Sequence, residues 1–422
     1  MRKAYSLLLY LALPFMLVYL GFRGLKDQGW TSRWRERFAF YREPTPIGGV
    51  VVHAASVGEI NAASPLVAAL LRDMPEVPVT LTTFTPTGSR RARELFGQQV
   101  RHLFVPIDLP GAARRLFRHV QPRLLIVMET EIWPNLFAAA RQAGVPVIMS
   151  NARLSASSMS GYRKVRPLIA HALGGLAWVG AQTRKDRDRL VSLGAPSQRT
   201  TVTGNIKFDL PVSATLEQEA TALRAEWGPG RPVLTAGSTR PGDETVLLSA
   251  FGQIRQHYPD TLMILAPRHP ERFAEAAASV RNAGYSVSLR SEGNEGAADT
   301  DCLVVDTLGE LMRYYACSDV AFVGGTFADI GGHNLLEPAA LGKPVLFGPH
   351  TENVDAIARE LESCGGGRRL HSESDLVESL AEWFEDETGR RAAGLAAKKR
   401  VESGRGAVEQ NMDRVRDIIR RS

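Results

Sequence analysis

The sequence predicts an α/β protein with two doubly wound parallel sheets, one in each half of the chain. The 422 residues exceed the roughly 100–200 residues of an ordinary domain. Short apolar runs alternate with amphipathic or alanine-rich stretches of helical period, the pattern of strands that alternate with helices. This alternation pauses once, at residues 209–232, where proline, glycine and charged residues replace the apolar runs.

The individual elements follow from this pattern. Strands of the first half are expected at 47–56, 77–85, 100–108, 123–130, 145–153 and 176–183, and those of the second half at 232–238, 261–268, 301–308, 320–326 and 343–349. Helices are expected between them, for example at 60–74, 134–144 and 244–258. We therefore predict domains at 27–210 and 211–404, and a last helix at 405–422 whose terminal position allows it to pack back on the first domain.

The N-terminus carries an uncharged segment at residues 4–22. As a helix it would span about 28 Å, close to the ~30 Å hydrocarbon core of a bilayer. No small-residue cleavage site follows, so residues 1–26 are predicted to be an uncleaved membrane anchor. Basic residues at 23–37 outnumber those at 2–3, which places the body in the cytoplasm. The alternative is an apolar helix that lies in the interface or packs on the protein, given Pro14 and the marginal length.

The charge of the chain gives a second indication of a membrane. The formal net charge is +6, but no zinc finger, RNP motif or basic helix repeat is recognisable, so nucleic acid is not expected as a partner. Arg33, Trp34, Arg35 and Arg37 follow the anchor, and this basic flank is expected to face anionic lipid. Three cysteines without a Cys-x-x-Cys pair indicate a reduced compartment.

Polar residues follow the predicted strands, at the sheet edge where doubly wound proteins bind ligands. Two such domains facing each other would form a cleft. His53, Ser56, Gly58 and Glu59 follow the first strand, and a glutamate there can act as a general base. The alternative is a carboxylate that only interacts with the dipole of the following helix.

Three further residues of the first half are candidates for catalysis. Glu129 and Glu131 follow the fourth strand, just before Trp133. One acid can cap the next helix while the other faces the cleft, so we predict that Glu129 is catalytic and Glu131 structural. Lys207, at the end of the first domain, can stabilise negative charge on a leaving group, although a solvated surface lysine is the default interpretation.

Four turns of the second half are candidates for nucleotide binding. The first, at 235–244, opens a helix and can bind an anion or simply cap that helix. An arginine in the second turn suits phosphate, and paired glycines in the fourth allow close backbone approach. The residues concerned are Arg268, His269, Gly309, Glu310, Gly331, Gly332, Asn334, Glu337 and Pro338. Together the turns predict a ribose and phosphate cradle, with Glu337 on sugar hydroxyls; alternatively, their polar groups cap only themselves.

These stretches resemble the 3-deoxy-D-manno-octulosonate (Kdo) transferases of lipopolysaccharide synthesis. The motifs occur in order as "HAASVGE", "ETEIWPN", "GNIKFD", "APRHPER", "DTLGEL" and "GGHNLLEPA", and the likeness runs from the anchor nearly to the C-terminus. The resemblance implies a GT-B fold, in which two Rossmann-like domains face a central cleft. It also implies a CMP-Kdo donor, a lipid A precursor as acceptor, and a location at the cytoplasmic face of the bacterial inner membrane.

The resemblance further implies roles for single residues. Glu59 matches the general base, and Glu129 and Lys207 match residues that assist the transition state. The nucleotide contacts correspond to Pro267, Arg268, Leu308, Gly309, Glu310, Asn334, Leu335, Leu336 and Glu337. In the implied mechanism an acceptor hydroxyl, deprotonated by Glu59, displaces CMP from the anomeric carbon through an oxocarbenium-like transition state.

Neither a metal nor another cofactor is expected, because CMP is a good leaving group. Asp-x-Asp tripeptides occur at 186–188 and 299–301, but both adjoin charged, surface-like segments and are not counted as metal sites. Two other functions remain open: a UDP-sugar transferase or sugar-nucleotide 2-epimerase of the same fold, and a tethered nucleotide-binding protein without activity. An epimerase would not need the anchor.

Overall fold

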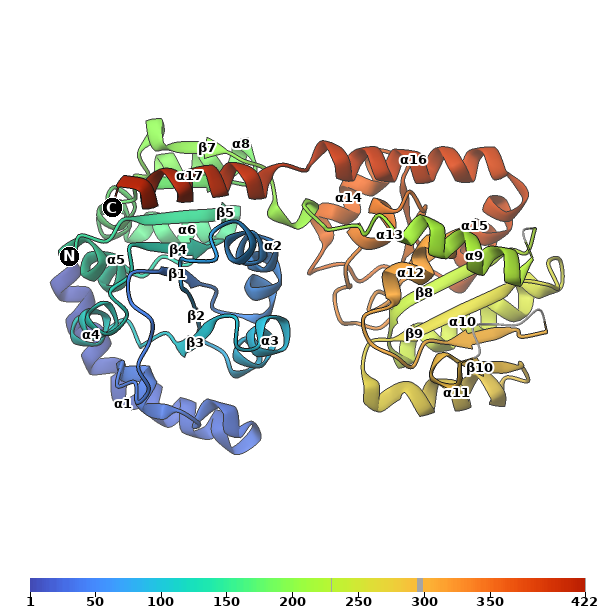
Figure 1. Cartoon of the computed structure of the whole chain (residues 1–422), viewed down its shortest axis with the longest axis horizontal. Helices are drawn as coiled ribbons and strands as arrows, with labels where there is room; N and C mark the ends of the chain where they lie inside the picture. Colours follow the sequence, from blue (N-terminus) through green and yellow to red (C-terminus); the bar gives the residue numbers. More distant parts are fainter. Residues whose placement is uncertain (229, 294–298, 422) are drawn as a thin grey trace. The chain divides into compact units, whose positions relative to one another are not determined.

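The computed structural model describes residues 1–228, 230–293 and 299–421, and it divides into two compact units. Unit 1 comprises Met1–Asp209 and Gly404–Ser422, and unit 2 comprises Leu210–Ser403. Each unit contains one parallel seven-stranded sheet with helices packed against it (Figure 1). The predicted α/β class with two doubly wound parallel sheets is therefore confirmed.

The sheet of unit 1 has the strand order β3-β2-β1-β4-β5-β6-β7. Its strands are β1 (Val50–His53), β2 (Val79–Thr83), β3 (Arg101–Phe104), β4 (Leu124–Met128), β5 (Val147–Ala152), β6 (Trp178–Ala181) and β7 (Thr200–Val202). The central strands are buried on both faces, which explains their nearly continuous apolar sequence. Only β7 was not predicted, because two of its three residues are exposed and form no apolar run.

The helices of unit 1 cover both faces of this sheet. They are α2 (Val57–Asp73), α3 (Pro86–Phe96), α4 (Pro110–Val120), α5 (Pro134–Gln142), α6 (Ala156–Lys164), α7 (Arg166–Leu173), α8 (Arg184–Ser192) and α17 (Ala407–Arg421). The last of these comes from the C-terminus and lies over the sheet of unit 1 (Figure 1). Its Met412 and Val415 join the same core cluster as Leu66 and Ile126. The carboxylate of Asp209 accepts hydrogen bonds from two backbone N–H groups at the start of α17, each at 2.6 Å.

The N-terminal helix α1 (Arg2–Lys26) is long and apolar enough to cross a membrane, yet it packs along unit 1 beside α4 and α5 (Figure 1). The Tyr5 hydroxyl donates to Asp108 at 3.0 Å near one end, and the Arg23 guanidinium lies over Trp30 at the other. One face of α1 thus contacts unit 1 in this structure. Its outer face exposes Leu7, Leu8, Leu11, Phe15, Val18 and Phe22.

In the segment after α1, one residue of the predicted basic flank, Arg37, does not face outward. Arg37 is fully buried, and its guanidinium lies over the rings of Phe84 and Phe104, with centroids at 4.9 and 4.1 Å. Aromatic faces attract a guanidinium, and the Phe84 carbonyl accepts a hydrogen bond from it. Arg37 therefore holds the 3-10 helix η2 (Trp34–Phe38) against the sheet and cannot face lipid.

The sheet of unit 2 has the order β10-β11-β9-β8-β12-β13-β14. Its strands are β8 (Val233–Thr239), β9 (Leu262–Pro267), β10 (Val287–Leu289), β11 (Cys302–Val304), β12 (Val320–Val323), β13 (Val345–Phe347) and β14 (Gly367–Arg369). The edge strands β10 and β14 were not predicted, because they are three residues long and partly exposed. The helices are α9 (Leu216–Trp227), α10 (Pro241–Arg255), α11 (Phe273–Asn282), α12 (Leu311–Cys317), α13 (Leu336–Ala340), α14 (Asp355–Ser363), α15 (Glu373–Glu385) and α16 (Glu387–Ser403).

The helix α9 lies in the segment where the strand–helix alternation was expected to pause. Its Ala220, Leu223 and Trp227 follow one another at helical spacing and are buried in a core cluster of unit 2. The polar residues between them hid this short apolar face. Most of the expected linker is thus part of the second unit.

Each sheet has one place where the strand order reverses. In unit 1 it lies between β1 and β4, and in unit 2 between β8 and β12. The connections on either side of such a point leave the sheet in opposite directions, which opens a crevice at the carboxyl ends of the two strands. Candidate functional residues are therefore sought at these two edges.

Candidate functional site

Glu59 lies in the first turn of α2, directly after β1. Its carboxylate accepts hydrogen bonds from the Ala55 backbone N–H (2.6 Å) and the Ser56 hydroxyl (3.2 Å), and Ser56 in turn caps the Glu59 N–H. The pKa of Glu59 is raised to about 7, and burial is the largest cause. The nearby Glu131 carboxylate also raises this pKa, and its effect is larger than the lowering caused by the Ala55 hydrogen bond. A carboxyl group with this pKa can accept a proton near neutral pH.

Glu129 follows β4, on the other side of the same reversal point. It is 7% exposed, and its backbone has a φ of +53°, which is uncommon for a residue other than glycine. Arg153 approaches its carboxylate with Nε at 2.8 Å. Such a strained backbone at a strand end is typical of functional sites, where the surrounding structure holds it in place.

Glu131 lies two residues further on. Its carboxylate accepts a hydrogen bond from the Trp133 indole (2.6 Å), and His53 Nε2 lies 3.9 Å away. Burial raises the pKa of Glu131, but His53 and Trp133 outweigh burial and leave it below its ordinary value. Glu131 is therefore the stable negative charge beside Glu59, and among neighbouring groups it has the largest effect on the Glu59 pKa. Sequence analysis did not predict this coupling between Glu59 and Glu131.

Lys207 lies in the 3-10 helix η4 (Ile206–Phe208), which packs against α2. The turn is fixed by two side-chain amides: Asn205 accepts from the Lys207 backbone N–H (3.0 Å), and Asn151 accepts from Ile206 (3.1 Å). The ammonium group is partly exposed. The structure thus brings Glu59, Glu129 and Glu131 to one sheet edge and holds Lys207 on an element that contacts the helix of Glu59.

In unit 2, a fully buried aspartate joins the two sides of the reversal point. Asp243, in the first turn of α10, accepts hydrogen bonds of 2.6–3.2 Å from the backbone N–H groups of residues 325–328 and a further bond of 3.0 Å from Arg240. Five donors converge on one carboxylate. Sequence analysis missed Asp243, although an acid at the third position after Arg240-Pro241 is a recognisable helix-start signal.

Four cationic or potentially cationic side chains lie at this edge of unit 2. Burial is the largest cause that lowers the pKa of His333 to about 4, and the charges of Arg268, Arg240 and His269 contribute to this shift. Arg268 is exposed at the end of β9, and within the described residues Arg240 Nε has no hydrogen-bond partner. These groups create a positive potential suited to an anion.

The predicted nucleotide residues of the fourth turn lie at the same edge. Burial raises the pKa of Glu337, while a hydrogen bond from Asn334 (3.1 Å) and the charge of Arg268 lower it in part. Arg268 and Glu337 are thus electrostatic neighbours. Leu335 and Leu336 are buried, so only their backbone groups can reach a ligand. Pro267 is the buried last residue of β9.

The turn after β11 contains the remaining predicted nucleotide residues. Gly309 has a φ of +89°, and Leu308 is 70% exposed. Glu310 forms ion pairs with Arg290 (3.0 Å) and Arg313 (3.8 Å). Because β11 pairs with β9, this turn belongs to the same sheet edge as the end of β9. In this turn the backbone and the Leu308 side chain are more available to a ligand than the carboxylate of Glu310, which is already ion-paired.

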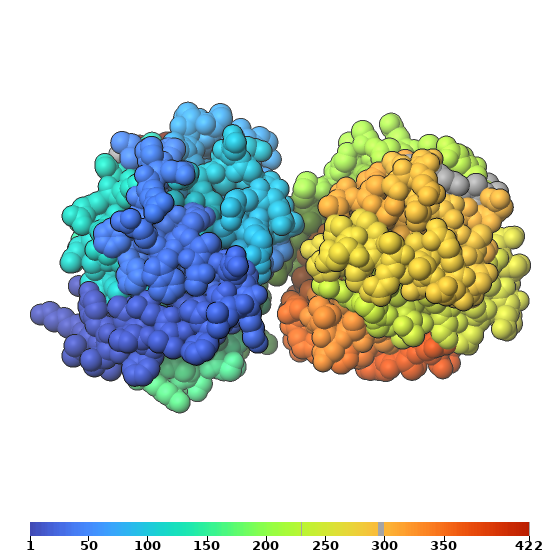
Figure 2. Space-filling model, turned by 90° about the horizontal axis from the view of Figure 1, so that it is seen from below, coloured from blue at the N-terminus to red at the C-terminus, as the bar shows by residue number. Residues whose placement is uncertain are grey.

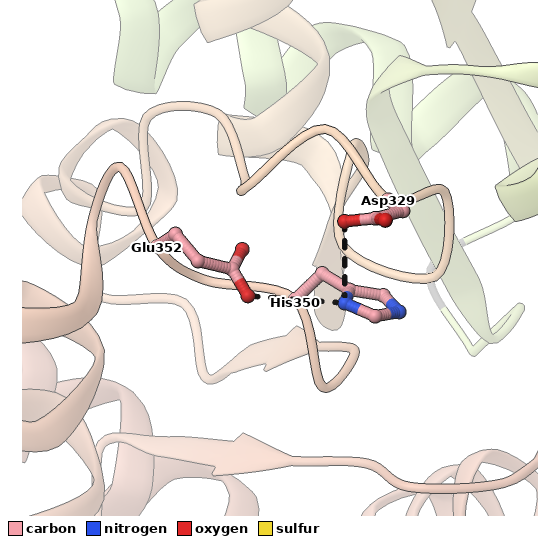
Figure 3. Close-up of side chains that lie close together, drawn as sticks. All are labelled: Asp329, His350 and Glu352. Carbon is pink, nitrogen blue, oxygen red and sulfur yellow. Dashed lines mark ion pairs between the residues drawn. The ribbon is translucent and has the colours of Figure 1, made fainter.

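Three acidic groups bear on the question of a metal. Within the Asp-x-Asp tripeptides, Asp186 accepts a hydrogen bond from the Leu154 N–H (2.8 Å), and Asp301 accepts one from the Ser286 N–H (2.9 Å). A third group consists of Asp329, His350 and Glu352, whose potential ligand atoms all lie within 4.8 Å of one another (Figure 3). His350 Nδ1 is 3.6 Å from an oxygen of Asp329 and 3.9 Å from an oxygen of Glu352, and both carboxylates are exposed.

Comparisons with known proteins show which family the chain is similar to. Residues 32–210 match the family described as 3-deoxy-D-manno-octulosonic-acid transferase (kdotransferase). The 3-deoxy-D-manno-octulosonic acid transferase of Haemophilus influenzae is 37% identical over 424 residues, which cover 100% of this chain and 99% of that relative. The enzyme of the same name from Bordetella pertussis is 38% identical over 428 residues, covering 95% and 98%.

A solved structure supports the fold alone. The UDP-GlcNAc 2-epimerase from Neisseria meningitidis, solved with UDP-GlcNAc, superposes with a TM-score of 0.52 at 16% identity, covering 84% of this chain and 98% of that one. At this identity the likeness says nothing about the reaction. The two relatives at 37% and 38% identity do bear on the reaction, because they match over nearly their whole length. They confirm the resemblance found in the motifs. The chain belongs to the Kdo transferase family of glycosyltransferases.

Proposed function

We propose that the chain transfers Kdo from CMP-Kdo to a hydroxyl group of a lipid A precursor, with Glu59 as general base. The observation that carries this proposal is the position of Glu59 at the reversal point of unit 1 with a pKa of about 7. General bases work best when their pKa lies near the working pH. The CMP-Kdo donor and the lipid A acceptor follow from family membership.

The chemical step is a direct displacement. The Glu59 carboxylate takes the proton of the acceptor hydroxyl, and the hydroxyl oxygen forms a bond to the anomeric carbon of Kdo. The bond from that carbon to the phosphate oxygen breaks, and CMP leaves with the electron pair, so the configuration inverts. The charges of Glu129 and Glu131 stabilise the positive, oxocarbenium-like transition state, and Lys207 balances the negative charge that grows on the phosphate.

Unit 2 holds the nucleotide in this proposal. The guanidinium groups of Arg268 and Arg240 bind the phosphate, since their fork of N–H donors matches its oxygens. Glu337, positioned by Asn334, accepts hydrogen bonds from the ribose hydroxyls. The backbone of the turns at 308–310 and 334–336 completes the contacts.

Membrane attachment through α1 completes the proposal. The helix packs one face on unit 1 and exposes a row of large apolar side chains on the other. This pattern suits a helix that lies in the interfacial plane of the inner membrane, with its outer face among the acyl chains. The body then remains on the cytoplasmic side, where a lipid acceptor reaches the catalytic edge.

The test is the variant Glu59→Gln, which keeps the shape of the side chain but cannot accept the proton. We expect the transfer rate to fall about 10²–10⁴-fold while CMP affinity stays unchanged. Mass spectrometry of products from CMP-Kdo and a lipid A precursor reports donor, acceptor and the number of Kdo groups together. The control is Glu94→Gln, an exposed glutamate on α3. Unchanged turnover in Glu59→Gln, or the absence of a Kdo-bearing product with the unaltered protein, would refute the proposal.

A further inference from the structure

A large cavity of about 1000 Å³ lies on unit 1, away from the residues considered so far. It is bounded by the segment from η2 to Pro46, by the end of α3, and by the first residues of β2 and β3. Its lining contains two glutamates but five arginines, which are Arg33, Arg35, Arg42, Arg93 and Arg101. Glu59 follows the opposite, carboxyl end of β1, so the cavity belongs to a different part of the sheet.

One ion pair builds the wall of this cavity. Glu36 binds Arg33 through two hydrogen bonds of 2.6 and 2.7 Å and also accepts the backbone N–H of Phe104 (2.9 Å). Arg33 in turn donates to the His102 carbonyl at 2.9 Å. The pair thus closes the exposed edge of β3, where unpaired backbone groups would otherwise remain. Arg33 and Glu36 are therefore structural.

The other arginines have few acidic partners. In the described part of the chain, the exposed side chains of Arg35 and Arg42 make no hydrogen bond or ion pair, and Arg93 bonds only to Ser89. Arg101 pairs with the exposed Glu43 at 2.6 Å, but its buried Nε has no partner there. Several guanidinium groups therefore surround the cavity with unused donors.

The neighbouring His102 has a lowered pKa, which is consistent with the positive potential of these arginines. His102 Nε2 lies 2.9 Å from the Thr83 hydroxyl, inside the wall. Burial, helped by the charges of Arg33, Arg93 and Arg101, lowers the pKa of His102 to about 3. The imidazole is neutral at physiological pH and adds no charge of its own. The arginines thus keep their full attraction for an anion.

We propose that this cavity binds the phosphate group of an anionic membrane lipid. Its volume is at the upper end of the roughly 300–1,000 Å³ of ligand pockets, enough for a headgroup larger than phosphate alone. Arginine forks match phosphate oxygens, and Trp34, Phe40 and Pro46 supply apolar lining.

The lipid source follows from the N-terminal segment. Arg33 comes seven residues after the end of α1, a reach of at most about 25 Å, so the cavity lies near the helix that carries the exposed apolar row. The N-terminal segment occupies one face of unit 1, in dark blue in Figure 2. This step rests on the proposed membrane attachment: the apolar row enters the acyl region and the arginines meet the headgroups.

The test measures binding of dihexanoyl phosphatidic acid to the full-length protein in neutral detergent, by titration calorimetry. The double variant Arg35→Gln/Arg42→Gln removes two unpaired guanidinium groups, and we expect at least tenfold weaker binding, since one charge-assisted contact is worth about tenfold. The matched control is Arg114→Gln/Arg118→Gln, which removes two exposed arginines of α4 outside the cavity and should leave the affinity unchanged.

Three results would overturn the proposal: no saturable binding, equal weakening in both double variants, or equally tight binding of inorganic phosphate, which would make the cavity a site for soluble anions. Unchanged hydrogen exchange in β1 and β4 serves as the check that unit 1 is folded in each variant. The outcome is separable from that of the proposed reaction. If the chain proved not to transfer Kdo, the result of the phosphatidic acid titration would still stand. If that titration showed no binding, the result of the Glu59→Gln experiment would still stand.

Discussion

The carboxyl edges of the two sheets have the same architecture but opposite charge. In unit 1 the reversal point carries Glu59, Glu129 and Glu131, and in unit 2 it carries Arg240 and Arg268 with two histidines. At both edges a residue other than glycine has a left-handed backbone at a strand end: Glu129 with φ +53°, and Ser238 with φ +56°. The fold thus fixes the place of a site, and the residues decide its chemistry.

Burial acts on both edges in the same way, by favouring the neutral form of an ionisable group. It raises the pKa of Glu59 to about 7 and lowers that of His333 to about 4. The consequences differ. Glu59 becomes a base that exchanges a proton near neutral pH, whereas His333 stays a neutral donor or acceptor within a cationic group. One edge is therefore suited to proton transfer and the other to anion binding.

The largest expected effect tests whether the two edges are structurally independent. Asp243→Ala leaves five backbone N–H groups of unit 2 without their buried acceptor, which should lower the free energy of unfolding of unit 2 by about 3–5 kcal/mol. Hydrogen exchange followed by mass spectrometry should show faster exchange in β8 and β12 and no change in β1 and β4.

The control for this prediction is Asp375→Ala, a partly exposed acid that accepts one backbone hydrogen bond (2.7 Å) at the start of α15. It should cost about 1 kcal/mol or less. Equal acceleration of exchange in both units after Asp243→Ala would mean that the units unfold together and that the comparison of separate edges fails.

A second prediction sharpens the division into a proton-transfer edge and an anion-binding edge. Arg268→Gln removes an exposed guanidinium from the edge of unit 2, and CMP affinity should fall about tenfold. Isothermal titration measures this change directly. Arg281→Gln, an exposed arginine at the end of α11, should have no effect. Unchanged CMP affinity in Arg268→Gln would remove this residue from the nucleotide site.

The smallest effect concerns the pH dependence of transfer. Because Glu59 must be deprotonated to act as a base, kcat/KM should rise as the pH passes through about 7 and then level off. Glu131→Gln removes the like charge that raises the Glu59 pKa, so the midpoint of this rise should move to lower pH, by up to about one unit. Rates measured from pH 5 to 9 provide the test.

The matched variant is Glu129→Gln. Glu129 has the smaller effect on the Glu59 pKa and is paired with Arg153, so the midpoint should move less than in Glu131→Gln. A larger shift for Glu129→Gln, or a shift of either variant to higher pH, would contradict the charge arrangement described for this edge.

The sequence predicted the central strands well, because their burial on both faces demands unbroken apolar runs such as residues 124–128. It failed for β7, β10 and β14, where three partly exposed residues pair mainly through the backbone. It also missed α9, whose three core residues are separated by charged ones. Strands that pair mainly through the backbone, and helices with few apolar residues, cannot be recognised from the pattern of apolar residues.

The site shows the same limit. Glu59 and Arg268 could be selected because both follow recognisable strands. The coupling of Glu59 to Glu131 could not, since it depends on Trp133 and His53 fixing a side chain from another strand. The buried position of Arg37 was equally hidden, because a local run of basic residues does not indicate that Phe84, just after β2, and Phe104, at the end of β3, will surround it.

The return of α17 to unit 1 has a consequence for biosynthesis. Unit 1 needs Ala407, Met412, Val415 and Ile419 to complete a core whose other buried members lie within the first 206 residues. Unit 2 is synthesised in full before these residues leave the ribosome, so it can finish folding first. The unit made first is thus completed last. A chain that loses its final 19 residues should expose the core of unit 1, while unit 2 stays intact.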